Sequence, residues 1–298
     1  MQAQSSEVRF FLQSLLPSSS AESLKQLERK TTNLANDFSE RDFYLTFSSL
    51  PRLFGKEKIN VTEELQKKAG RLRSGFNPAG FTAVQTARVM LALMIPFDDQ
   101  NRYLKILNHL FSTGEVGELV ALYSALPLLP RPELFRQRAS EGIRSNITVV
   151  FDAIALNNPY PADYLDEDAF NQMVLKAVFI ERPLDKIYGL DERANRKLAR
   201  MLSDYAHERW AASRYVTPEL WRPVGPFIDA ILLKDIERLL EQGSELEKQA
   251  AALAVQSCSF ATAKERLPAQ LKARVENKEF DWKSVSEKWH TEKNSMMA

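Results

Sequence analysis

Side chains that could do chemistry are concentrated in one stretch of the sequence, residues 164–227. A solvated helix surface is expected to use Lys, Glu and Ala. This stretch instead uses Arg, His, Trp and Asn, whose side chains suit buried polar contacts and ligand binding. We therefore regard it as the candidate site. Ten of its residues are candidates for binding a ligand or a partner: Asn171, Lys176, Arg193, Asp204, His207, Glu208, Arg209, Trp210, Trp221 and Arg222.

The first chemistry that the spacing suggests is acid–base catalysis. Asp204 and His207 are three residues apart and so share one face of a helix. His207 could act as a general base with Asp204 or Glu208 orienting it. The alternative is a satisfied polar network that ties two helices together. Glu287 and His290 repeat the spacing, but a di-iron bundle also needs a Glu from each of two further helices, so we expect no metal site.

Other catalytic motifs are not supported. His207–Glu208 begins like a zinc-protease helix, but Ala211 occupies the position of the second His. No Ser lies in a Gly-x-Ser-x-Gly context, and no phosphate-binding loop is present. The single cysteine, Cys258, follows an apolar helical run and is expected to be a small core residue. We assign no catalytic residue, no metal ligand and no cofactor.

The same residues also suit a binding site that does no chemistry. Trp210 and Trp221 offer flat aromatic faces, while Arg209 and Arg222 offer planar forks for anionic groups. A concave pocket lined in this way would hold an aromatic or polar metabolite. Packing in the core is the competing explanation for the aromatic residues.

The composition sets limits on the class of protein. Lys plus Arg (40) nearly equals Asp plus Glu (39) in a chain of 298 residues, so nucleic acid or an anionic membrane is not an expected partner. No apolar run approaches the 18 residues of a membrane span. The amino terminus lacks the pattern of a signal peptide, so we expect a cytoplasmic protein.

The elements that must position the candidate residues are helices. Glycine is scarce (10 residues), and apolar residues recur at helical spacing. We expect the helix at 191–213 to pack against the helix at 166–180 and the segment at 217–227, with Asp204 or Glu208 paired to Arg222 or Lys176. The predicted helices from residue 81 onward are 82–95, 98–112, 115–126, 132–157, 166–180, 191–213, 217–222, 227–242 and 245–257.

A weak internal repeat refines the fold. Residues 106–130 resemble residues 236–260: each has a Leu four residues before a Gly, a Glu four after it and an Ala eleven after it. This pattern predicts a helix, a tight turn and a second helix with a small-residue face, as in HEAT-type solenoids. We therefore predict an all-α fold of stacked antiparallel helical hairpins, without a β-sheet. The expected organisation is one continuous domain made of N-terminal helices with a basic connector (1–80), a helical-hairpin domain (81–276) and a polar C-terminal tail (277–298). Trp282 and Trp289 are seven residues apart in this tail, so they could dock one helical face onto the body.

Residues 182–227 carry a resemblance to a known family. They read RPLDKIYGLDERANRKLARMLSDYAHERWAASRYVTPELWRPVGPF and resemble the signature stretch of the EboA family of metabolite traffic proteins. DYAHERWAASR (204–214) is the most specific part. The flanking segments NQMVLKAVFI (171–180) and ILLKDIERLLEQGSELEKQAAALAV (231–255) resemble the same family. The resemblance covers about residues 100 to 260.

The resemblance implies a role rather than a reaction. EboA proteins occur in bacterial gene clusters with a prenyltransferase-like membrane protein, a metal-dependent hydrolase-like protein and a sugar-metabolism-like enzyme. These clusters make or move a secondary metabolite toward the periplasm, including scytonemin precursors in cyanobacteria. The family has no established catalytic residues to carry over. We expect a non-catalytic accessory or scaffold protein whose partners are proteins of the cluster or a small metabolite, with the enzyme built on His207 as the alternative.

Overall fold

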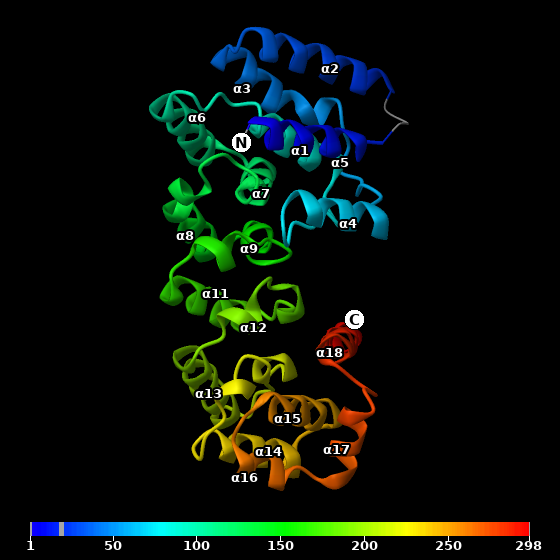
Figure 1. Cartoon of the computed structure of the whole chain (residues 1–298), viewed down its shortest axis with the longest axis vertical. Helices are drawn as coiled ribbons and strands as arrows, with labels where there is room; N and C mark the ends of the chain where they lie inside the picture. Colours follow the sequence, from blue (N-terminus) through cyan, green and yellow to red (C-terminus); the bar gives the residue numbers. More distant parts are fainter. Residues whose placement is uncertain (1, 18–20, 298) are drawn as a thin grey trace. The chain divides into compact units, whose positions relative to one another are not determined.

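The computed structural model describes residues 2–17 and 21–297 of the chain. These residues form helices joined by short connections (Figure 1). No strand occurs in the described part of the chain, where the isolated antiparallel bridge between Lys58 and Thr82 pairs two connecting segments. The all-α class predicted from the sequence is confirmed.

The chain divides into two compact units, residues 1–165 and residues 166–298. The boundaries predicted at residues 80 and 276 both fall inside these units. All ten candidate residues lie in the second unit, so that unit alone must position them.

The first unit is built around three helices that pack in succession. Helix α7 lies between α5 and α9, and α1 packs against α5 (Figure 1). Nearly every side chain of α5 is buried, as expected for a helix covered on several sides. The helices of this unit are α1 (Gln2–Ser14), α2 (Ala21–Asn36), α3 (Glu40–Ser49), η2 (Leu50–Arg52), α4 (Glu63–Leu72), α5 (Ala83–Ala92), α6 (Gln100–Thr113), α7 (Val116–Ala125), η3 (Pro132–Phe135), α8 (Arg136–Arg144), α9 (Thr148–Ala155) and α10 (Tyr160–Tyr164).

The second unit is organised around α15. This helix contacts α14, α16, α17, α18 and the short turns η5 and η6. Its residues 250–255 are all buried, and four of these six are alanines, which let neighbouring backbones approach closely. The helices of this unit are α11 (Glu167–Phe179), η4 (Leu184–Lys186), α12 (Leu190–Arg193), α13 (Arg196–Ala211), η5 (Pro218–Trp221), η6 (Gly225–Phe227), α14 (Leu233–Gln242), α15 (Glu245–Ser257), α16 (Ala261–Arg266), α17 (Ala269–Glu276) and α18 (Trp282–Met297).

The internal repeat corresponds to the same turn in each unit. Gly114 ends α6 and Gly243 ends α14, and each N–H donates to the carbonyl of the Leu four residues earlier over 2.9 Å. A Cβ would lie 2.7 Å from the Leu110 carbonyl oxygen at the first glycine and 2.5 Å from that of Leu239 at the second, so a larger residue does not fit. The predicted helix, tight turn and helix is confirmed in both copies.

The repeated glutamate has the same task in both turns. Glu118 and Glu247 each accept the backbone N–H of the residue that follows the glycine, over 3.1 and 2.8 Å. This contact is half of a capping box, which satisfies an N–H at the start of the second helix. The spacing of Leu, Gly and Glu in the sequence is therefore the spacing that one tight helix–turn–helix connection requires.

The predicted single helix at 132–157 is wrong. The chain forms the 3₁₀ turn η3 and two separate helices there, with a break at 145–147. Ser145 has extended backbone, and its hydroxyl accepts the N–H of Ile147 over 3.2 Å. A serine that bonds its neighbouring backbone offers the chain an alternative to the helical hydrogen bond.

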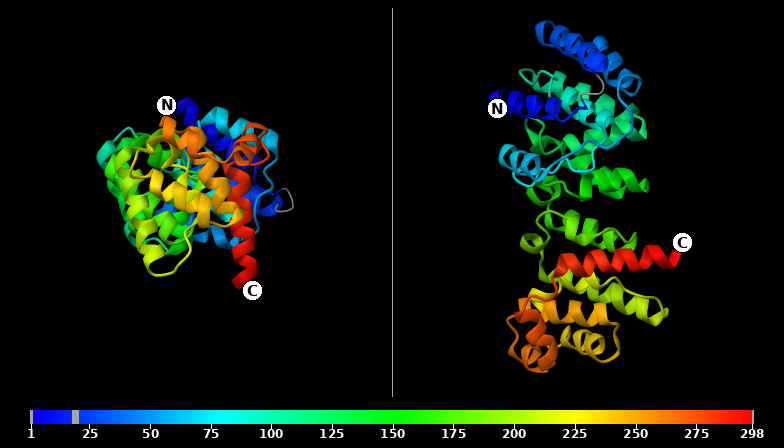
Figure 2. Two further views of the ribbon diagram at one scale, coloured as in Figure 1. Left: turned by 90° about the horizontal axis from the view of Figure 1, so that it is seen from below. Right: turned by 90° about the vertical axis from the view of Figure 1, so that its right-hand side faces the viewer.

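Residues 282–297 of the predicted polar tail form the helix α18. This helix packs against α15, η4 and η5 (Figure 2). Val285 and Ser286 are buried, and Phe280 just before the helix is buried too. Trp289 packs edge-on against Tyr215 with ring centroids 5.5 Å apart. One face of α18 is thus part of the core of the second unit.

Cys258 is buried, as predicted for a small core residue. None of the helices in the described residues is both long and apolar enough to cross a membrane.

Candidate functional site

Asn195 fixes the start of the central helix of the site. The sequence predicted one helix over 191–213, but α12 ends at Arg193 and α13 begins at Arg196. Asn195 lies between them with extended backbone, and its side-chain oxygen accepts the N–H of Leu198 over 2.8 Å. Asparagine is among the most favoured helix caps because its short side chain reaches this N–H.

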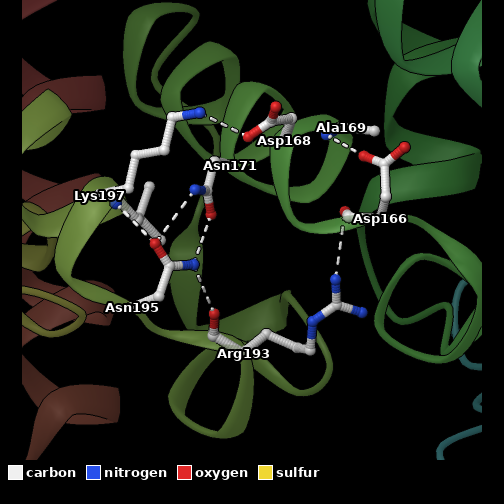
Figure 3. A network of polar contacts seen from close by, with 8 residues as sticks. Asp166, Asp168, Ala169, Asn171, Arg193, Asn195 and Lys197 are labelled. Carbon is white, nitrogen blue, oxygen red and sulfur yellow. Dashed lines mark hydrogen bonds and ion pairs between the residues drawn. The ribbon is translucent and has the colours of Figure 1, made fainter.

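A pair of asparagines joins α11 to α13. The Asn171 amide donates to Asn195 over 3.1 Å, and the Asn195 amide donates back to Asn171 over 2.8 Å (Figure 3). The same Asn195 amide donates to the carbonyl of Arg193 over 3.1 Å. Asn171 is buried, so this exchange satisfies amide groups that burial would otherwise penalise. The predicted packing of this helix against residues 166–180 is confirmed.

The charged residues around the asparagine pair are satisfied by contacts among α11, α12 and α13 (Figure 3). The Arg193 guanidinium lies 4.7 Å from the centre of the Phe170 ring and donates to the Asp166 carbonyl over 3.2 Å. Lys197 donates to Asp168 over 2.6 Å, and this hydrogen bond raises the pKa of Lys197. The contacts of Asn171 and Arg193 in this network are therefore those of a helix junction.

His207 takes its carboxylate partner from another helix. Its Nε2 lies 2.6 Å from Oδ1 of Asp235 on α14, and the Ser203 hydroxyl donates to the other oxygen of Asp235 over 2.6 Å. The Asp235 side chain is buried while His207 is half exposed. The prediction that Asp204 or Glu208 would orient His207 is wrong, because both of these side chains point to solvent on the exposed face of α13.

Trp210 lies in a stack of flat groups next to His207. Its ring is nearly parallel to that of fully buried Trp221, with an interplanar angle of 18° and centroids 5.8 Å apart. The Arg238 guanidinium carbon lies 4.5 Å from the centre of the Trp210 ring. The His207 ring lies 5.6 Å away. Trp221 is therefore a packing residue, while Trp210 connects the core to the surface.

A surface groove runs along this stack. It has a volume of about 490 Å³ and lies between the C-terminal half of α13 and one face of α14. Cationic, acidic and aromatic side chains all reach it, together with exposed Ile231. The lining residues are His207, Trp210, Ile231, Lys234, Asp235, Glu237, Arg238, Glu241 and Gln242.

The chain was compared with protein-family models, with curated proteins and with solved structures. A family model described as metabolite traffic protein EboA matches residues 8–225. The chain belongs to the EboA family. No curated protein and no solved structure gives a match.

The EboA match covers one side of the groove. His207 and Trp210 lie inside the matched residues, whereas α14, with Lys234, Asp235 and Arg238, lies beyond residue 225. The match also reaches back to residue 8, which extends the resemblance from residue 100 through the N-terminal helices.

Arg222 lies apart from the groove residues of this EboA chain. It forms a two-point ion pair with Asp191, with both nitrogen–oxygen distances 2.7 Å. Burial lowers the pKa of Arg222, but the hydrogen bonds and charge of Asp191 outweigh this effect and raise the pKa overall. Lys176 is half-buried on α11, and burial lowers its pKa. The predicted pairing of Arg222 with Asp204 or Glu208 is wrong.

Arg209 completes the set of predicted residues. Its guanidinium carbon lies 5.5 Å from the centre of the Tyr215 ring, and its Nε donates to the Tyr215 carbonyl over 3.1 Å. It thereby braces the loop after α13. Burial raises the pKa of the neighbouring Tyr205 hydroxyl. Of the ten predicted residues, the structure brings His207 and Trp210 together in the groove and Asn171 and Arg193 together at the helix junction.

The sequence reasoning missed the α14 side of the groove. Asp235 lies three residues after Leu232 and four before Leu239, so an acid stands on the buried stripe of a helix. That position is a signal of a buried polar contact, since lone buried carboxylates are costly. Lys234 and Arg238 carried no such signal because they look like ordinary surface cations.

The second unit of the EboA chain contains another buried acid with a histidine partner. Glu219 is almost fully buried, and its Oε2 lies 2.9 Å from Nε2 of His290 on α18. Its Oε1 accepts the N–H of Asp185 over 3.1 Å. His290 therefore pairs with Glu219, not with Glu287 in its own helix. In the part of the chain that the structure describes, no group of three or more His, Cys, Asp or Glu side chains is placed to hold a metal ion.

Proposed function

We propose that this EboA-family chain is a non-catalytic accessory protein of metabolite traffic, acting in the cytoplasm of a bacterium. It binds a small secondary metabolite, and it brings that metabolite to proteins encoded in the same gene cluster. The family description supports the traffic role. The observation that carries the binding role is the groove of about 490 Å³ beside Trp210. The Trp210 ring stacks on buried Trp221 and also lines this partly polar groove.

The groove has the mixed character that small-molecule sites need. Aromatic and aliphatic surface is supplied by Trp210 and Ile231, and orienting groups are supplied by His207 and the α14 side chains. Binding sites commonly combine apolar walls with a few convergent polar groups. His207 is fixed by buried Asp235, so its ring does not have to be ordered when a ligand binds.

We also propose that the helices form stacked hairpins of the HEAT type, with the scaffold role carried by the surface that such stacks offer to partners. Support comes from the succession of α5, α7 and α9 in the first unit and from the repeated hairpin turn. Pull-down of tagged chain with individually expressed proteins of its gene cluster tests the scaffold role. Failure of every cluster protein to bind would leave the scaffold role without support.

The binding role is tested by identifying small molecules that co-purify with the protein. Denatured wild-type protein from the native host should release a small molecule detectable by mass spectrometry, and Trp210→Ala should release much less. Trp282→Ala is the matched control, because Trp282 lies on α18 and does not line the groove. Equal amounts from all three proteins, or none from wild type, would contradict a metabolite site at Trp210.

The enzyme alternative has one observation in its favour. A buried carboxylate that holds a half-exposed histidine is the arrangement of a general base with its orienting acid. In this alternative His207 acts on a ligand in the groove, and Asp235 replaces Asp204 or Glu208 as the orienting residue. Incubation of the released metabolite with wild type and with His207→Gln separates the two proposals. Conversion by wild type alone would favour the enzyme, and no conversion by either favours the carrier.

A further inference from the structure

Two cations, Lys234 and Arg238, line the groove together with three acids, Asp235, Glu237 and Glu241. Lys234 and Arg238 are four residues apart on α14 and share one face of the helix. Among the described residues, neither takes part in an ion pair. Two of the three acids are engaged elsewhere: Asp235 holds His207, and Glu237 lies 3.5 Å from Arg266.

The Arg238 guanidinium packs against the aromatic stack at the groove. It lies over the Trp210 ring at 4.5 Å, and Trp210 is in turn stacked with fully buried Trp221. A guanidinium that stacks by its face keeps its N–H groups free at its edge. Those N–H groups form a planar fork that matches the two oxygens of a carboxylate or phosphate. Because the contact with Trp210 restricts the Arg238 side chain before a ligand binds, an anion that binds it loses less affinity to side-chain ordering.

The charges in the groove favour a singly charged anion. Lys234 and Arg238 contribute two positive charges, and Glu241, one turn from Arg238, offsets one of them. Exposed Ile231 provides an apolar wall in the same groove.

We propose that the groove binds an organic monoanion, with a carboxylate on the fork of Arg238 and the ammonium of Lys234 and with a planar apolar body against Ile231. This inference rests on the proposed metabolite-binding function and names its ligand class. A phosphate group offers the same oxygens, but a dianion would meet the charge of Glu241. A carboxylate is therefore the better match.

The test uses isothermal titration calorimetry of the full chain at low ionic strength with three probes. The probes are 2-naphthoate, its neutral amide 2-naphthamide and inorganic phosphate. Naphthoate should bind at least about tenfold more tightly than naphthamide, since a hydrogen bond to a charged group is worth about one such factor or more. Phosphate should bind more weakly than naphthoate.

The variants Arg238→Ala, Arg238→Lys and Lys234→Ala locate the site. All three variants should weaken naphthoate binding. The loss should be about tenfold or more for Arg238→Ala. It should be smaller for Arg238→Lys, which keeps the charge but loses the planar fork. Lys272→Ala, an exposed cation on α17 outside the groove, should leave the affinity unchanged. If Arg238→Ala does not fold, Lys234→Ala and Arg238→Lys carry the test.

Three results would overturn the inference. These are equal affinity for naphthoate and naphthamide, tighter binding of phosphate than of naphthoate, or unchanged affinity in folded Lys234→Ala and Arg238→Lys. Absence of naphthoate binding to wild type would overturn it as well. None of these results touches the metabolite released from purified protein, so a neutral metabolite lost in Trp210→Ala would leave the proposed function intact.

Discussion

The contact between His290 and Glu219 should hold α18 on the second unit, and its loss should be costly. The Glu219 side chain is 2% exposed, with His290 Nε2 at 2.9 Å and the Asp185 N–H at 3.1 Å as its hydrogen-bond partners. His290→Ala leaves a buried carboxylate with one neutral donor. Removal of one member of a buried pair typically costs 3–5 kcal/mol. Because the His290 side chain is 25% exposed and water can approach the vacated position, we expect the loss to be lower, about 2–3 kcal/mol.

Tryptophan fluorescence measures the loss of stability in the second unit, where His290 lies. All four tryptophans, Trp210, Trp221, Trp282 and Trp289, lie in the second unit, so the signal does not depend on the first. Urea unfolding of His290→Ala should give a lower midpoint at an unchanged slope, which identifies a loss of stability and not a change in the unfolded state. Lys288→Ala, an exposed substitution in the same helix, should stay within about 0.5 kcal/mol of wild type.

A double-mutant cycle decides whether the charge of Glu219 causes the effect. Glu219→Gln removes the charge and keeps the size, so His290→Ala should cost less in that background than in wild type. A coupling of about 1–2 kcal/mol is expected for this pair. Equal costs of His290→Ala in the two backgrounds would refute the reasoning, since the loss would then come from packing of the ring alone.

Three further predictions follow from single contacts. Asn195→Ala should lower the stability of the second unit by about 1–3 kcal/mol in urea, because it removes a helix cap and an amide pair, and Asn195→Ser, which keeps a cap, should lose less. Gly225→Ala should lower the free energy of unfolding by about 1–3 kcal/mol in the same assay, since its Cβ would lie 2.8 Å from the Ala254 carbonyl oxygen. A variant as stable as wild type would show that the backbone shifts to make room for the Cβ. Hydrogen bonding to Arg274 lowers the pKa of Glu245 below its ordinary 4.5, so the stabilisation from this pair is present at neutral pH and disappears as the pH falls through the lowered pKa. Glu245→Gln should therefore make the urea midpoint depend less on pH in that acid range. The same acid dependence in the variant as in wild type would contradict this prediction.

Local signals in the sequence were enough to find most helices of the fold. The ends of α6 and α14 were predictable because Gly114 and Gly243 meet a carbonyl oxygen that excludes any larger residue. The break at 145–147 was not predictable from periodicity, because its apolar residues continue at helical spacing and the competing hydrogen bond of Ser145 is a matter of local geometry. The seven-residue spacing of Trp282 and Trp289 indicated a helical face in the tail, but it could not show which segments that face contacts.

The candidate site was harder to predict because its decisive contacts are distant in sequence. His207 was correctly placed on one face of α13, but its partner Asp235 comes from a helix 28 residues further along the chain. Residue spacing within one helix predicts which side chains are neighbours on that helix. It does not predict which side chains of another helix they contact. The same limit applies to His290, whose partner Glu219 lies 71 residues away.

The repeated turn shows which positions of a helical hairpin the backbone itself dictates. Each compact unit contains one copy, and in each copy a glycine meets a carbonyl oxygen while a glutamate four residues later caps the following helix. The backbone geometry of the turn therefore fixes the same three residue types in both units, whereas the helix surfaces around them are free to differ. Replacement of either glycine by a larger residue should therefore disturb its own helical hairpin through the same clash with a leucine carbonyl oxygen.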